Sequence, residues 1–490
     1  MNPPLKEGVL PGLSLCMIVK NEETYLKGCL ESVKSLVDEI IIVDTGSTDK
    51  TVEIARSYTS KIYFFEWVHD FAKARNESIK HATREWILYL DADERLPKTY
   101  HTPIRNLLNR KEFGAYMLNL KCYSDPKDKS KFEIAVYRRI FKNYKGIQFQ
   151  GKVHEQIYYS LQKIGAVTGS TDILIEHLGY AVSKDIMDQK MQRNLELIQK
   201  NIEEDPEDSY AWHQLSGTYV AMKDYEKAYM PALKAISLPN ITPSTKARCY
   251  NILGMIAAYY KEFYRCRFFC RESIRLAKVQ LQAYYYMADS FYVQGIYEGA
   301  LRSYLKLQEY IALPQTQLKQ SITVDITVPK WHISLMLSKI YDKLSDHLNA
   351  IKYAKKALKE NQSLKECHYL IAITQTKQHQ FKKAEKHLNK LKSKDWKARY
   401  LMAMGYLRKE QKKYQEALTI FNRYIKEYPE ETDFSQAYLA QSEIYYELKD
   451  PKHLTEAVEK FILLSPEENQ EKIRLGLYKK YQLGNNNFVQ

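Results

Sequence analysis

Short apolar runs alternate with amphipathic segments along the first part of the chain. Runs of strand length occupy residues 13–19, 39–44, 61–67 and 86–90. Helical spacing of apolar residues, or a turn able to cap a helix, marks residues 24–37, a segment from about 50 onward, and residues 72–84. This β-α-β-α-β-α-β order predicts a mostly parallel sheet with right-handed crossovers.

Polar residues follow three of these apolar runs at the point where each run ends. They are Lys20-Asn21, Asp44 and Asp91-Ala92-Asp93. Ligands of open α/β sheets bind outside the carboxyl ends of the strands. We therefore expect these side chains to converge at one edge of one sheet and to form a ligand site there.

The two aspartates of Asp91-Ala92-Asp93 suit a divalent cation. In extended backbone, residues two apart point to the same side of the strand. The two carboxylates are therefore expected to lie side by side and to bind the same ligand. Such carboxylates bind Mg²⁺ or Mn²⁺ together with a diphosphate. The alternative is that an aspartate at a strand end only caps the helix that follows it.

Two further polar residues are candidates for nucleotide contacts. Asp44 can accept a hydrogen bond from the imide of a uracil or from a ribose hydroxyl. Arg75, at the start of a predicted helix, can reach a base or a phosphate. Turn chemistry alone explains Gly46 and Ser47 beside Asp44, and a solvated surface position is the alternative for Arg75.

Beyond residue 205 small residues recur with a period of about 34 residues. Ala228, Ala300, Ala350, Ala384 and Ala417 belong to successive copies. Cys266 and Cys270 occupy the same small-residue positions, so their spacing indicates helix packing and not a metal site. Stacked helix pairs of this kind form a superhelix whose concave face suits a peptide or a second copy of the chain.

Composition narrows the class of protein. Hydrophobic residues make up 45% and charged residues 27% of the 490 residues, which is typical of a globular protein. The net charge is +15, yet no basic block with interleaved aromatics stands out, so we expect no nucleic-acid partner. No apolar run reaches the ~20 residues that span a bilayer. The seven scattered cysteines are typical of reduced thiols, and the N-terminus has no apolar signal segment, so the expected location is the cytoplasm.

Four ordered motifs carry a family resemblance. They are IVKNEE, EIIIVDTGSTDKTVEIA, W-x₂-DFAKARN and EWILYLDADE. Together they resemble the family-two glycosyltransferases of GT-A fold, over roughly residues 13–180. A later element, residues 151–155 (GKVHE), and the helical C-terminal part resemble the peptide S-glycosyltransferases of the sublancin type. Transferases that extend lipopolysaccharide cores carry a similar DTGSTD/DADE pattern, so the branch of the family stays open.

The resemblance implies a nucleotide site. It places Val19, Asn21 and Asp44 around the uracil and the ribose of a UDP-sugar. It places Asp91 near the ribose and the metal, and makes Asp93 the main protein ligand of Mg²⁺ or Mn²⁺. Many members have a second acidic residue where this chain has threonine after Asp44, so any role of that residue is lost or moved here.

The resemblance also implies the remaining site residues. His177 resembles a late histidine that closes the metal or diphosphate site. It is equally plausible that His177 is a core histidine whose hydrogen bonds are satisfied within the fold. Glu155 is the candidate catalytic base, with His154 beside it as an orienting group or alternative base. The alternative for this pair is a hydrogen bond at the surface of a loop.

The function expected from these residues is inverting transfer of a sugar from a UDP-sugar to a Ser/Thr or Cys side chain of a peptide or protein. The repeats would hold the acceptor or pair two subunits. Two alternatives stay open: a glycosyltransferase acting on a cell-surface glycan or lipid-linked saccharide, and a catalytically inactive repeat scaffold.

The predicted organisation is an α/β N-terminal GT-A domain with a Rossmann-like sheet, followed by an all-α solenoid of tetratricopeptide repeats. The expected boundaries are 1–181 for the catalytic domain, 182–205 for a connecting helix, 206–314 for repeats, 315–330 for an insert, 331–480 for further repeats, and 481–490 for a flexible tail.

Overall fold

The computed structural model describes residues 3–123, 132–178, 184–313, 328–431 and 434–483. The chain divides into two compact units, Met1–Thr327 and Val328–Gln490. The first unit contains the α/β domain and a first set of helices, and the second unit is helical. The predicted α/β domain followed by a helical array is confirmed. Most of the predicted insert and of the tail lies outside the described residues.

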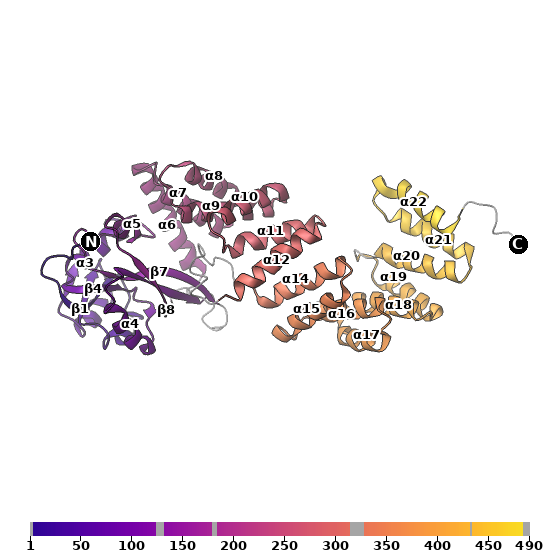
Figure 1. The fold of residues 1–490 in the computed structure, drawn as a ribbon, viewed down its shortest axis with the longest axis horizontal. Coiled ribbons are helices and arrows are strands. Elements are labelled where there is room, and N and C mark those ends of the chain that lie inside the picture. The colour runs from indigo at the N-terminus through magenta and orange to yellow at the C-terminus, as the bar shows by residue number, and fades with distance from the viewer. Residues whose placement is uncertain (1–2, 124–131, 179–183, 314–327, 432–433, 484–490) are drawn as a thin grey trace. The chain divides into compact units, whose positions relative to one another are not determined.

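The α/β domain is built on an eight-stranded mixed sheet of strand order β3-β2-β1-β4-β7-β6-β8-β5 (Figure 1). Its strands are β1 (Leu10–Val19), β2 (Glu39–Asp44), β3 (Ile62–Phe64), β4 (Arg84–Tyr89), β5 (Glu94–Arg95), β6 (Ala115–Tyr123), β7 (Phe132–Lys142) and β8 (Thr168–His177). The first four strands in sequence are parallel, as predicted. β7 is antiparallel to β4 and β6, and β5 is antiparallel to β8.

Helices cover both faces of the sheet. They are α1 (Leu26–Val33), α2 (Thr51–Arg56), α3 (Phe71–Lys80), α4 (His101–Leu108) and α5 (Tyr158–Lys163), with the 3₁₀ turn η1 (Lys98–Tyr100). Leu30 of α1 and Ile104 of α4 pack with Leu15 in one core cluster. Ile79 of α3 and Leu161 of α5 pack in another. The central strands are therefore buried on both faces, which explains their continuous apolar sequences.

The first unit continues into paired helices. They are α6 (Lys184–Glu204), α7 (Ser209–Ala221), α8 (Tyr225–Ser237), α9 (Pro243–Tyr259), α10 (Phe263–Leu276), α11 (Leu281–Val293) and α12 (Tyr297–Ile311). A β-carbon added at Gly254 of α9 would lie 3.0 Å from the sulfur of Cys270 in α10. These two helices cross closely, as the small-residue pattern predicts.

The first helices of the array pack on the α/β domain. Val153 contacts a cluster of Leu195 and Ile198 of α6 and Leu215 of α7. Lys152 forms an ion pair with Glu204. Because of such contacts, the division into compact units falls at residue 327 and not at the end of the α/β domain.

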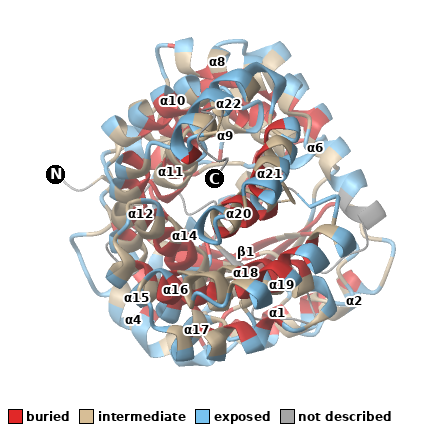
Figure 2. Ribbon diagram, turned by 90° about the vertical axis from the view of Figure 1, so that its right-hand side faces the viewer, coloured by how far each residue is buried: buried red, intermediate tan, exposed pale blue. Residues whose placement is uncertain are grey.

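The second unit has the same helix-pair organisation. Its helices are α14 (Lys330–Lys343), α15 (His347–Glu360), α16 (Lys365–Lys377), α17 (Phe381–Leu388), α18 (Lys397–Glu410), α19 (Tyr414–Glu427), α20 (Phe434–Glu447), α21 (Pro451–Leu463) and α22 (Glu467–Tyr481), with the 3₁₀ turns η2 (Asn389–Leu391) and η3 (Lys394–Trp396). Buried residues gather on the helix faces that meet neighbouring helices (Figure 2). A β-carbon added at Gly405 of α18 would lie 2.6 Å from the ring of Phe421 in α19, so these two helices also cross closely.

The turn inside each helix pair has a left-handed residue two positions after the first helix ends. These residues are Lys223, Lys261, Gly295, Ser345, His379, Lys412 and Lys449, with φ between 57° and 73°. Six of the seven are not glycine, although glycine adopts this conformation at least cost. The repeat is therefore marked by backbone conformation as well as by small residues. In the described ranges no helix is both long and apolar enough to cross a membrane.

Candidate functional site

The carboxyl ends of three strands meet at one edge of the sheet. β1 lies between β2 and β4 and is parallel to both. In this register Val19 pairs with Asp44, and Cys16 pairs with Tyr89. The residues that follow these strands therefore share one edge, and the predicted convergence is confirmed.

Asn21 and Asp44 hold the loops at this edge together. The Asn21 amide oxygen accepts a hydrogen bond from the Thr48 N–H at 2.8 Å, and the Asn21 N–H donates to Ser47 Oγ at 3.0 Å. The Asp44 carboxylate accepts from the N–H groups of Gly46 and Ser47. These bonds give the loops a fixed shape. The nucleotide contacts expected of Val19, Asn21 and Asp44 stay predictions.

Asp91 and Asp93 follow β4 in a turn, because the Glu94 N–H donates to the Asp91 carbonyl at 3.0 Å. The expectation of extended backbone here is wrong, and the two carboxylates have different partners. Asp91 Oδ1 accepts from Arg75 at 2.7 Å, whereas Asp93 Oδ2 lies 3.1 Å from Nε2 of His177. The backbone turns because the buried Glu94 carboxylate accepts a hydrogen bond from the Asp91 N–H at 3.0 Å.

Two buried arginines connect the acidic residues of the site. Arg75 of α3 donates to both Asp91 and Glu155. Arg139 of β7 pairs with Glu94 and lies 3.6 Å from Asp91 Oδ2. Each guanidinium also lies over the ring of Tyr89, at 4.9 Å for Arg75 and 4.4 Å for Arg139. The result is a continuous chain of ion pairs that ends at the candidate base.

This chain shifts the pKa values of its members in opposite directions. Burial raises the pKa of Asp91, but Arg75 and Arg139 outweigh it and hold that pKa well below its usual range. Burial dominates at Glu94, and with the nearby Asp91 charge it raises the pKa to about 7. Asp91 is therefore an anion engaged by two cations, whereas Glu94 is the member of the chain whose affinity for a proton burial increases.

Asp93 and His177 face each other across the end of the sheet. β5 and β8 are paired so that Glu94 lies opposite His177, which brings the imidazole to Asp93. Burial lowers the pKa of His177, but hydrogen bonds with Asp93 and Cys122 outweigh it and raise the pKa to about 10. The proton between the imidazole and the carboxylate is thus held strongly, and a cation bound to both groups would replace it.

Glu155 and His154 lie on a short hairpin between Gln150 and Gln156, whose backbone groups exchange two hydrogen bonds. His154 has a φ of 54° and is exposed. The Glu155 side chain is 12% exposed, with Oε1 held by Arg75. Among the described residues none donates to Oε2 of Glu155, so this oxygen is available to accept a proton.

Several residues of the site had no signal in the sequence. Arg139 lies in the middle of β7, far along the chain from the motifs. Glu94 follows the aspartates directly, but its burial depends on tertiary packing. Arg75 is 7% exposed, which excludes the solvated surface position that the sequence left open.

Glu22 lies near the same acidic residues. Burial, with the Asp93 charge, raises the pKa of Glu22 to about 7, while Lys190 of α6 opposes the shift.

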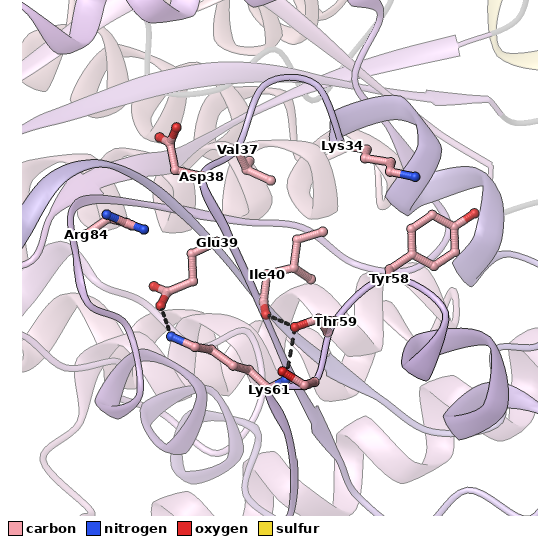
Figure 3. A pocket seen from close by; sticks show the side chains of 10 residues that line it. Lys34, Val37, Asp38, Glu39, Ile40, Tyr58, Thr59, Lys61 and Arg84 are labelled. Carbon is pink, nitrogen blue, oxygen red and sulfur yellow. Dashed lines mark hydrogen bonds and ion pairs between the residues drawn. The ribbon is translucent and has the colours of Figure 1, made fainter.

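A pocket of about 470 Å³ lies at the opposite edge of the sheet, near the start of β2 (Figure 3). In this pocket Lys61 forms an ion pair with Glu39. The Glu39 carboxylate also accepts hydrogen bonds from the hydroxyls of Ser14, at 2.6 Å, and Thr83, at 2.7 Å. Burial raises the pKa of Glu39, but these bonds outweigh it and lower the pKa to about 2. The carboxylate is thus fully used within the fold, so this pocket is a poorer candidate than the carboxyl edge.

Residues 14–164 match glycosyl transferase family 2. The N-terminal domain belongs to this family. Residues 332–363 match the tetratricopeptide repeat. The family match covers β1 through α5 and includes Asp44, Asp91, Asp93 and Glu155, so the ion-pair chain lies within it.

Two curated relatives each carry one of these two parts in their name. The TPR repeat-containing protein Synpcc7942_0270 of Synechococcus elongatus is 34% identical over 44% of this chain and 54% of its own length. The prophage-derived glycosyltransferase SunS of Bacillus subtilis is 29% identical over 46% of this chain and 53% of its own. A solved tetratricopeptide repeat protein from Parabacteroides merdae is 18% identical over 57% of this chain and 94% of its own, with a TM-score of 0.33. The chain spans about half the length of the curated relatives it matches.

A divalent cation fits the donor atoms at this edge in part. Asp93 offers a hard carboxylate oxygen and His177 an imidazole nitrogen, whereas Asp91 is already paired with two arginines. In the described part of the chain no group of three His, Cys, Asp or Glu side chains is placed to hold a metal ion. A cation here would need oxygens of a diphosphate or of water to complete its coordination.

Proposed function

We propose that this chain is an inverting, metal-dependent glycosyltransferase that moves a sugar from a UDP-sugar to a Ser/Thr or Cys side chain of a peptide or protein. The observation that carries the proposal is the arrangement at the carboxyl edge of a family 2 domain. There the Asp93–His177 pair lies next to the chain of ion pairs from Asp91 through Arg75 to Glu155.

On the donor side, Asp93 and His177 would hold a Mg²⁺ or Mn²⁺ ion through Oδ2 and Nε2. When bound, such an ion offsets the negative charge of the departing diphosphate. Asp91 is fixed by Arg75 and Arg139, which suits it to orient a ribose hydroxyl by accepting its hydrogen bond. The loops joined by Asn21 and Asp44 lie at the same edge, where a uracil would be placed.

On the acceptor side, Glu155 takes the proton of the attacking hydroxyl or thiol. The oxygen or sulfur forms a bond to the anomeric carbon as the bond from that carbon to the diphosphate oxygen breaks. The diphosphate leaves with the electron pair, and the configuration at the anomeric carbon inverts. Arg75 keeps Oε1 of Glu155 in place, so Oε2 is the oxygen that receives the proton.

The position of Glu155 supports a peptide acceptor presented by the repeats. The hairpin that carries it contacts α6 and α7 through Val153, and the Lys152 carbonyl accepts from the Phe71 N–H at the start of α3. The base therefore sits where the α/β domain and the first repeat helices meet. A peptide lying along the repeats would reach the base without crossing the sheet.

The test is release of UDP from a panel of UDP-sugars with Mn²⁺, followed by mass spectrometry of candidate peptides and NMR of the product anomer. The wild-type protein should release UDP from at least one donor, and Asp93→Asn should abolish the release. Asp224→Asn is the matched control, because Asp224 caps α8 and asparagine caps equally well. No release of UDP with any donor would favour the inactive scaffold. Glycosylation of a saccharide in place of a peptide would show that the acceptor is a glycan or lipid-linked saccharide.

A further inference from the structure

Polar atoms without partners gather where the α/β domain meets the first repeat helices. In the described residues, both ring nitrogens of His213 and the Nε atoms of Arg138 and Arg248 are buried and have no hydrogen-bond partner. His213 lies on α7, Arg248 on α9 and Arg138 on β7. Buried polar groups in folded proteins are almost always paired, so four such atoms in one place indicate a missing partner.

These three side chains act on one another electrostatically. Burial, with smaller contributions from Arg248 and His154, lowers the pKa of His213 to about 3. Burial also lowers the pKa of Arg138, to which Arg248 contributes. A run of aromatic contacts joins two of them: Arg138 lies over the ring of Tyr158, and ring contacts continue from there through Tyr159 and Tyr210 to His213. Arg248 acts on both from α9.

The cations of this group are Arg138 and Arg248, because His213 with its low pKa is neutral. Arg138 lies over the ring of Tyr158 at 4.5 Å, and His213 contacts the ring of Tyr210 at 6.0 Å. Neither arginine has a carboxylate partner among the described residues. This differs from Arg75 and Arg139, each of which is buried and paired with acidic groups. Two like charges held near each other without an anion are unfavourable unless a ligand supplies one.

The place of this group relative to the site indicates what it would bind. His154 is adjacent in sequence to the candidate base Glu155, and it lies close enough to His213 to influence its pKa. Burial raises the pKa of Tyr137, which precedes Arg138 on β7, and the charges of Arg139 and Arg248 oppose the shift. The group therefore lies near the hairpin that carries the candidate base.

We propose that Arg138, Arg248 and His213 form an oxyanion subsite that binds a phosphate or carboxylate group of a substrate of the catalytic domain. The proposal rests on the proposed function for its substrate. The anion is either the diphosphate of the donor or an acidic group of the acceptor. Two of the three side chains come from the repeats, so the site of the family 2 domain is complete only with α7 and α9 in place.

The test is calorimetric binding of UDP, uridine and inorganic phosphate to the full chain, in the wild type and in Arg248→Gln. Losing a charge-assisted contact should weaken anion binding about ten- to a hundredfold. Arg248→Lys keeps the charge and should restore part of the loss. Arg271→Gln, an exposed arginine on α10, is the matched control and should bind all three probes as the wild type does.

The pattern of losses identifies the source of the anion. Weaker UDP binding with unchanged uridine binding assigns the subsite to the donor diphosphate. Unchanged UDP binding with weaker phosphate binding assigns it to an acidic group of the acceptor. Equal binding of UDP and phosphate by wild type and Arg248→Gln overturns the proposal. A wild type that binds phosphate through Arg248 but binds no UDP leaves the subsite standing and contradicts the proposed function.

A second variant separates binding from folding. His213→Phe removes two unpaired buried nitrogens and keeps an aromatic ring at the position, so the variant should keep or exceed the wild-type melting temperature. It should also show a smaller rise in melting temperature on addition of phosphate. A lower melting temperature with an undiminished phosphate effect would mean that His213 has a packing role and no part in the subsite.

Discussion

The ion pairs of Arg75 make a quantitative prediction for Arg75→Met. Removing one partner of a buried ion pair costs about 3–5 kcal/mol, because a charge is left buried without compensation. Asp91 keeps Arg139 and its side chain is 38% exposed, so solvent limits its share of the loss. Glu155 is 12% exposed and has no other cation among the described residues. We therefore expect a loss near the lower end, about 3 kcal/mol.

Hydrogen exchange of the β4 amides, followed by mass spectrometry in the full chain, measures this loss in the α/β domain alone. The variant should exchange about a hundredfold faster than the wild type at these amides. Arg105→Met is the matched control, since Arg105 pairs with Asp38 at the surface, with both side chains more than a third exposed. Such exposed pairs contribute less than about 1 kcal/mol.

The double variant Arg75→Met/Glu155→Gln isolates the origin of the loss. Glutamine in place of the unpaired glutamate removes the buried charge, so the double variant should be more stable than Arg75→Met by about 1–2 kcal/mol. Equal exchange in Arg75→Met and Arg105→Met would refute the reasoning, as would additive losses in the double variant. Either result would mean that Arg75 and Glu155 are not coupled within the fold.

Three further predictions concern other parts of the molecule. Glu155→Gln should reduce turnover about 10²- to 10⁴-fold with UDP affinity retained, and steady-state kinetics with unchanged turnover would place the base elsewhere. Glu39→Gln should make the free energy of unfolding less sensitive to acid. The pKa of Glu39 falls from 4.5 to about 2 on folding. Ionised Glu39 therefore contributes about 3 kcal/mol to the free energy of unfolding above pH 4.5, and this contribution is lost toward pH 2. Acid unfolding curves that match for wild type and variant would contradict this. Gly405→Ala should destabilise the second unit by about 1 kcal/mol, because its β-carbon would lie 2.6 Å from the Phe421 ring and overpacking exceeds the gain in helix propensity. Gly476→Ala on α22 has open space and should stabilise the unit instead, as exchange of α18 and α22 amides would report.

The parallel half of the sheet was predictable because its information is local. β1, β2 and β4 are apolar runs with polar residues directly after them, and a parallel sheet brings such ends together. The repeats were predictable for a similar reason. Ala228 and Cys270 fill close helix crossings, and any larger side chain there would separate the helices.

The site itself was less predictable because its contacts join distant segments. The sequence predicts only that Arg75 is a polar residue on a helix. In the structure the rings of Tyr89 and Phe149, from other segments of the chain, lie against its guanidinium. Arg139 is one of two successive arginines on β7, and only the pleat of the strand decides which of them meets Glu94. The turn at Asp91 likewise depends on a buried Glu94 carboxylate that no local pattern reveals.

Calorimetric titration of UDP, with and without Mn²⁺, tests the central claim that the acidic edge of the sheet grips a nucleotide diphosphate through a cation. Wild-type protein and the Asp224→Asn control should bind UDP at least tenfold more tightly with Mn²⁺ than without it. Asp93→Asn should lose this difference while its β4 amides stay protected from exchange. Binding of UDP that is equally tight with and without Mn²⁺, or that survives unchanged in folded Asp93→Asn, would contradict the account.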